Sequence, residues 1–246
     1  MIDAMTILRT QRSWRDAALV DAHAAARDAV HALAGLEKAV AALTANLRDL
    51  GYPPVPGVIP PEPGLDSRLR HLEATVGGAA PPILVAFWQQ VGGISLVDLE
   101  GYSHVEFWKA HGVTGPDGYC DGIHVDPCSA AWVESAVQDF TDLTEDPGSP
   151  PLDGPYLLTL APDGYHKDDI SGGVPYGIEV GGGWLAPFQN FSWTGPRRPV
   201  SALPEPIDLL GYFRTSILEC AGFPALLGVP AFEPFRERLL RNVEIF

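Results

Sequence analysis

A continuous seam of apolar residues runs through residues 13–50 and sets the strongest constraint on the fold. Apolar side chains recur there at alternating spacings of three and four residues, over more than four heptads. The seam consists of Leu19, Ala22, Ala26, Ala29, Leu33, Leu36, Val40, Leu43, Leu47 and Leu50. This spacing keeps the side chains on one helix face, so it predicts one long amphipathic helix. Gly51 and the prolines Pro53 and Pro54 end it, because proline cannot continue a helix.

The residues beside this seam indicate what it packs against. A free-standing helical dimer usually carries charges at the flanking e and g positions. Here these positions hold uncharged residues, among them Val30, Ala32, Ala39, Thr44 and Asn46. A broad, alanine-rich face favours packing against the body of the same chain. A monomer is therefore favoured, and a dimer through this helix stays the alternative.

The rest of the chain places helices before strands. Residues 51–64 contain six prolines and predict an extended connector. Two helices follow, over residues 65–76 and from Pro82 to about residue 91, each ended by glycine. Short β-prone runs then occupy residues 94–99, 122–126, 156–161 and 175–180. A last long helix is expected over residues 206–221, and the tail adds a short helix and a closing strand.

This order of elements predicts the fold class. Helices that precede the strands, instead of alternating with them, indicate an α+β fold with a mostly antiparallel sheet and helices packed around it. The expected organisation is a long N-terminal helix in residues 1–50, a proline-rich connector in 51–64 and an α+β domain in 65–246.

Charge limits the kind of partner. The whole chain carries a net charge of −15, and residues 95–170 contain 15 acidic residues against only Lys109 and Lys167. Such a surface repels nucleic acids and anionic membranes and attracts basic proteins or cations. The same acidity is also explained by a simpler role, which is to keep the protein soluble. No apolar run approaches the roughly 18 residues of a membrane span, no secretory signal is visible, and the three cysteines are expected to be reduced thiols in the cytoplasm.

Residues 120–128 invite a metal-site interpretation. Cys120, His124 and Cys128 are spaced four residues apart, and Asp121 and Asp126 could add oxygen ligands. A glycine and an Asp-Pro pair within the segment favour a strand that ends in a turn, and a strand spreads these side chains over too great a length for one ion. No nucleotide-binding glycine motif is present either. We therefore expect neither a metal nor a cofactor.

Residues 161–173 form the most polar segment. Asp163, His166 and Asp168 form a potential acid–base set, with Ser171 as a nucleophile, but the Gly-x-Ser-x-Gly motif of a presented serine is absent. Turns at each end explain the composition, so a recognition loop is the preferred interpretation. A hydrolase remains the alternative, using Asp163 and His166 or the set Asp121, His124 and Asp126.

Residues 69–93 resemble the opening of the SMI1/KNR4 (SUKH) superfamily. A short helix ending in Leu72-Glu73 leads through glycines to a proline-started helix and then to Gly92-Gly93 before the first strand. The runs at 166–176 and 222–224 resemble those of a longer bacterial branch, so the resemblance covers about residues 65–225. It implies helices packed around a central sheet, without a catalytic set. Many bacterial relatives are immunity proteins that neutralise toxins, often nucleases, and others are scaffolds or regulators.

Charge and resemblance together predict a non-catalytic binding module, of the immunity type, that neutralises a basic, nuclease-like toxin. A scaffold that uses the N-terminal helix is a further alternative to the hydrolase. Trp184 joins the expected binding surface because tryptophan is enriched at interfaces. The expected partner-binding residues are Asp121, Asp163, His166, Lys167, Asp168, Asp169 and Trp184.

Overall fold

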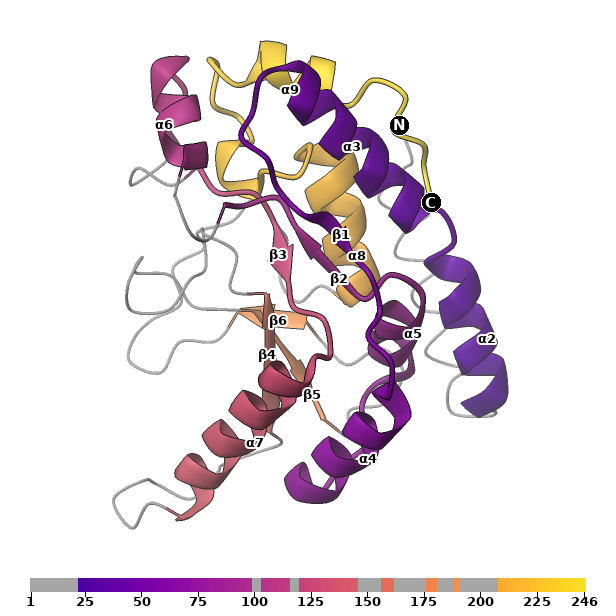
Figure 1. The fold of residues 1–246 in the computed structure, drawn as a ribbon. Coiled ribbons are helices and arrows are strands. Elements are labelled where there is room, and N and C mark those ends of the chain that lie inside the picture. Colours follow the sequence, from indigo (N-terminus) through magenta and orange to yellow (C-terminus); the bar gives the residue numbers. More distant parts are fainter. Residues whose placement is uncertain are drawn as a thin grey trace.

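The structure is a computed structural model that describes residues 22–98, 103–115, 120–145, 156–161, 176–180, 188–190 and 208–246 (Figure 1). Its helices are α2 (Ala22–Ala32), α3 (Leu36–Asp49), α4 (Leu65–Val76), α5 (Pro82–Gln90), α6 (Ser103–Ala110), α7 (Ala130–Glu145), α8 (Leu209–Arg214) and α9 (Glu233–Leu239), with a π-helical turn η2 (Thr215–Glu219) and a 3-10 turn η3 (Pro224–Leu226). Its strands are β1 (Gly57–Ile59), β2 (Gly93–Ser95), β3 (His124–Val125), β4 (Leu157–Ala161), β5 (Tyr176–Glu179) and β6 (Phe188–Asn190). The fold is therefore mixed α+β.

The described strands form two small antiparallel sheets. One has the order β1-β2-β3 and the other the order β4-β5-β6. The backbone N–H of Asp126, directly after β3, donates to the carbonyl of Leu160 on β4 at 3.0 Å. This hydrogen bond links the two sheets, which lie end to end in the centre of Figure 1. The prediction of antiparallel pairing is confirmed, whereas the one central sheet that was expected is replaced by two small sheets among the described strands.

Residues 22–50 of the N-terminal seam fold as two helices, so the prediction of one long helix is wrong there; residues 13–21, with Leu19, lie outside the described residues. Gly35 has φ of +98°, a left-handed conformation that ends α2 and begins α3. The inward packing is confirmed, because the seam side chains Ala29, Leu33, Leu36, Val40, Leu43 and Leu47 are all buried. α2 packs against α5, and α3 packs against β1 and α9. Both helices run along one side of the molecule, opposite α7 (Figure 1).

The connector is part of the sheet. Residues Gly57–Ile59 form β1 and pair with β2, so that Val58 lies opposite Ile94. Gly92 permits the close approach, because it has φ of +86° and a side chain there would overlap the backbone of Ile59. The N-terminal helices, the connector and the later elements contribute to one hydrophobic core.

Other expected elements differ in extent. The helices at residues 65–76 and from Pro82 are confirmed, whereas α6 and α7 were not expected. The last long helix is shorter than residues 206–221 and finishes as the π-helical turn η2. The expected short helix in the tail is α9, but residues 240–246 form no strand. None of the described helices has the length and apolar character needed to cross a membrane.

Candidate functional site

Most of the expected partner-binding residues lie outside the part of the chain that the structure describes. Asp121 is the one that it places. The others are Asp163, His166, Lys167, Asp168, Asp169 and Trp184.

Asp121 lies in the interior, which corrects its assignment to a binding surface. It is 7% exposed, and its Oδ1 hydrogen-bonds with Nε2 of His104, a fully buried residue on α6. Tyr52 belongs to the same region, and its hydroxyl donates to the carbonyl of Leu96 at 3.1 Å. Burial raises the pKa of Tyr52 well above its usual value, and Cys120 and Asp121 raise it further. A carboxylate that is withdrawn from solvent and bonded to a buried histidine cannot attract a partner from solution.

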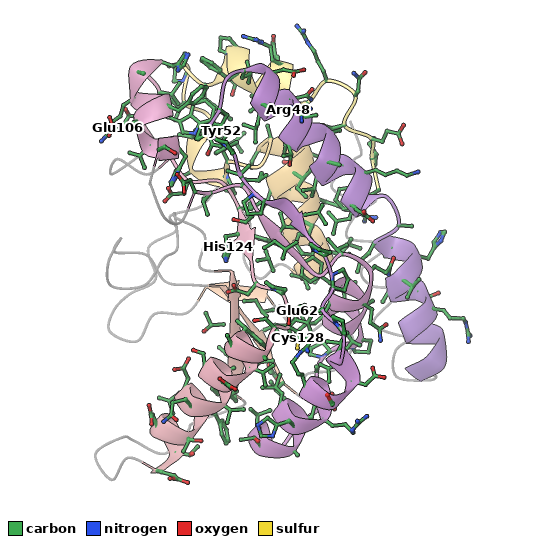
Figure 2. All side chains as sticks on the ribbon, viewed as in Figure 1. Arg48, Tyr52, Glu62, Glu106, His124 and Cys128 are labelled. Atoms are coloured by element: carbon green, nitrogen blue, oxygen red, sulfur yellow. The ribbon has the colours of Figure 1, made fainter. Side chains whose placement is uncertain are left out.

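The residues spaced four apart around β3 have different surroundings. Nε2 of His124 hydrogen-bonds with Oδ1 of Asp126 at 3.0 Å. The backbone carbonyl of Cys128 accepts a hydrogen bond from Nε of Arg68 at 2.6 Å. Burial raises the pKa of the Cys128 thiol to about 11, and a protonated thiol is a poor metal ligand. Figure 2 shows His124 and Cys128 at separate places along this segment.

The geometry of the expected hydrolase set follows from these pairs. The two carboxylates of the set, Asp121 and Asp126, each bond to a different histidine, His104 and His124. Within the described residues, no three side chains of His, Cys, Asp or Glu gather in a way that could hold a metal ion. The other proposed pair, Asp163 and His166, lies outside those residues.

Helix α7 provides the candidate site in the described part of the chain. Its inner face is apolar, since Val133 and Ala136 are buried, and Phe140 makes an edge-to-face contact with Tyr156 at 5.0 Å between ring centroids. Ser129 begins the helix, because its Oγ accepts a hydrogen bond from the backbone N–H of Trp132 at 3.1 Å. These contacts fix which side of α7 faces solvent.

The outer face of α7 is acidic. Four carboxylates are exposed there, and the helix contains no lysine, arginine or histidine; we call this set the α7 acidic face, and it consists of Glu134, Asp139, Asp142 and Glu145. Partial burial raises the pKa of Asp139, and the negative charge of Asp142 raises it further. The two side chains are three residues apart and therefore neighbours on the helix surface. Ionising both carboxyl groups costs free energy because like charges repel. A cation placed between them would offset that cost.

Two acidic residues on other helices have basic neighbours. Glu106 contacts Lys109 at 3.3 Å, and Glu233 contacts Arg236 at 3.1 Å. No ion pair found among the described residues includes a member of the α7 acidic face. Asp142 accepts a hydrogen bond only from a neutral group there, the Gln138 amide, at 2.6 Å. The charge of this face is therefore not neutralised by the described part of the molecule.

Sequence reasoning missed this face although the sequence carries its signals. A serine at position 129 precedes the apolar residues Val133, Ala136, Val137 and Phe140, whose spacing of three and four residues is typical of an amphipathic helix. The charge count had identified the region as acidic without placing the acids on a helix.

Comparisons with protein-family models, with curated proteins and with solved structures find no match to this chain. Its function is therefore inferred from the chemistry of its own surface.

Proposed function

We propose that this protein is a non-catalytic binding module of the cytoplasm, and that the α7 acidic face holds a basic protein partner. The observation that carries the proposal is the set of four exposed carboxylates on a helix without a single basic residue. Clustered like charges on a rigid helix increase the rate at which an oppositely charged partner associates. The apolar inner face anchors α7 to α4, so the charges are presented on a fixed element.

The resemblance to the SMI1/KNR4 superfamily supports a narrower form of the proposal. Immunity proteins of that superfamily neutralise toxins, and nuclease toxins are basic because they bind nucleic acid. A net charge of −15 agrees with such a partner. We propose an immunity-type protein that occupies the basic surface of a nuclease-like toxin.

The test measures binding of a fluorescent 12-residue oligolysine by anisotropy over a range of salt concentrations. The first variant removes three charges from α7: Glu134→Gln, Asp139→Asn and Asp142→Asn. The matched control removes three exposed charges from other helices: Glu37→Gln, Asp49→Asn and Glu237→Gln. We expect the α7 variant to bind roughly tenfold more weakly, with a shallower salt dependence, because each exposed pair contributes about 0.2–1 kcal/mol.

The control separates a specific face from overall charge, because both variants change the net charge by the same amount. Retention of most of the parent affinity by the control supports the proposal. Equal losses in the two variants would show that oligolysine responds to net charge alone, and the α7 acidic face would then have no special role.

A further inference from the structure

A surface cavity of about 340 Å³ lies where the connector meets the start of α4. Its lining contains two carboxylates, one amide and no basic side chain; it consists of Pro61, Glu62, Gly64, Leu65, Asp66 and Gln89. This volume is at the lower end of the range for ligand pockets, so it suits a single side chain better than a larger metabolite.

Arg68 fixes the backbone segment that lines the cavity through hydrogen bonds. Its guanidinium donates from Nη1 to the carbonyl of Pro63 at 2.7 Å and from Nη2 to the carbonyl of Glu62 at 3.2 Å. Its Nε donates to the carbonyl of Cys128 at 2.6 Å. In all three hydrogen bonds the Arg68 guanidinium group donates to a backbone carbonyl oxygen. The Glu62 carboxylate is 3.9 Å from Nη2, at the outer limit of an ion pair.

The second carboxylate, Asp66, is exposed in the first turn of α4 and belongs to none of the ion pairs found among the described residues. Leu65 and Pro61 add apolar surface to the same lining. The cavity thus combines acidic oxygens with an apolar wall. An arginine side chain has the matching parts, since its methylene groups pack on apolar surface and its planar guanidinium donates five hydrogen bonds.

The position of the cavity relates it to the α7 acidic face. Arg68 connects the cavity wall to Cys128, which directly precedes Ser129, the residue that begins α7. Helix α4, which starts at the cavity, packs along α7. Resting on the proposed function, we infer that this cavity receives one arginine side chain of the basic partner that binds α7.

The test uses a capped amino acid, Nα-acetyl-arginine amide, and its uncharged citrulline counterpart. Backbone amide shifts in ¹H–¹⁵N spectra are followed for Gly64, Leu65, Asp66 and Gln89. We expect saturable shifts with the arginine compound, at an affinity in the millimolar range, and none with citrulline at the same concentrations.

The double variant Glu62→Gln, Asp66→Asn should bind the arginine compound at least fivefold more weakly. The matched control Glu37→Gln, Asp49→Asn changes the net charge equally, away from the cavity, and should bind as the parent does. Equal shifts with citrulline, or undiminished binding by the double variant, would overturn the inference.

The two proposals fail separately. If capped arginine titrates the cavity but the α7 substitutions leave oligolysine binding unchanged, the cavity site stands and the proposed face is wrong. If the α7 substitutions weaken oligolysine binding but capped arginine does not shift the four amides, the proposed function stands and the cavity inference is overturned.

Discussion

Close backbone approach at Gly92 shows how much a single position contributes to this fold. Gly92 precedes β2 with φ of +86°, and a Cβ atom there would overlap the backbone of Ile59, Pro60 and Pro61. A side chain would therefore push β1 and β2 apart at the end of their pairing.

We expect Gly92→Ala to lower the free energy of unfolding by about 3 kcal/mol or more, because it adds a backbone clash to an unfavourable φ. Gly112→Ala is the matched control, since Gly112 also has a positive φ, of +69°, but a Cβ atom there would meet nothing within 4 Å beyond its chain neighbours. Its cost should be about 1 kcal/mol. Urea unfolding of the two variants measures both values, and equal losses would argue against the steric explanation.

Residue-level prediction from the sequence succeeded where a repeating pattern exists. The burial of Leu36, Val40 and Leu43 follows from their spacing. The burial of Asp121 could not be predicted in this way. Its partner His104 is 17 residues away, on a helix that the sequence pattern did not indicate. A charge count treats every carboxylate as exposed, and only the tertiary contact distinguishes this one.

At the scale of elements, the inner face of α7 packs against the rest of the molecule, whereas the like charges on its outer face lower the stability of the folded protein. Burial and the charge of Asp142 raise the pKa of Asp139 in the folded protein. A raised pKa means that the folded state binds this proton more tightly than the unfolded chain does. The stabilisation that comes from this tighter proton binding is present below pH 3.8, the pKa of the carboxyl group in the unfolded chain. It is lost as the pH rises through the higher pKa of the folded protein.

We therefore expect Asp139→Asn to stabilise the protein at pH 7, where the native carboxylate is ionised, by a few tenths of a kcal/mol. The gain should shrink below pH 3.8, where the native carboxyl group is protonated. The same variant should bind oligolysine more weakly, the combination expected of a residue kept for binding at a cost in stability. Thermal unfolding at both pH values provides the measurement, and destabilisation at pH 7 would contradict it.

Predicted elements matched the structure where local signals mark both ends. Helices α4 and α5 have a glycine stop and a proline start that are visible in the sequence. The break between α2 and α3 was not predicted, since Gly35 interrupts a seam whose apolar spacing continues on both sides. A single glycine is tolerated in many helices, and here the left-handed backbone at Gly35 also lies against Phe246, a contact that no local pattern shows.

For the molecule as a whole, a side chain on α3 connects distant parts of the chain. Nδ2 of Asn46 donates to the carbonyls of Leu239 and Arg241, each at 2.8 Å. Leu239 is the last residue of α9, so the amide satisfies carbonyl groups that a helix end leaves without a partner. The hydrogen bonds fasten α9 to the N-terminal half.

We expect Asn46→Ala to lower the free energy of unfolding by about 1–3 kcal/mol, because two hydrogen bonds are lost. Asn46→Asp should cost more, since its carboxylate would face two carbonyl oxygens. Gln138→Ala removes an amide hydrogen bond from the exposed surface of α7 and serves as the control, with an expected change within about 0.5 kcal/mol. Chemical denaturation measures all three, and an Asn46→Ala variant as stable as the control would show that this connection contributes nothing.

The α+β class was predicted correctly although its stated basis was wrong, because helices and strands alternate along the chain from α3 to β4. Antiparallel pairing in both sheets is what the structure shares with the prediction. The division into helix, connector and domain was less informative, because β1 of the connector pairs with β2 and α3 shares the common core. Such pairings join residues far apart in the sequence, and their register depends on the whole packed structure.

The bond between Asn46 and Leu239 spans 193 residues, and this separation has a consequence for biosynthesis. Translation at about 5–20 residues per second places roughly 10–40 s between the synthesis of α3 and that of α9. During that interval part of the leucine-rich seam has no docking surface, and the nascent chain offers it to chaperones or to other chains. Expression at a temperature or with codons that lengthen the interval should therefore favour aggregation, with this N-terminal seam as the first segment exposed.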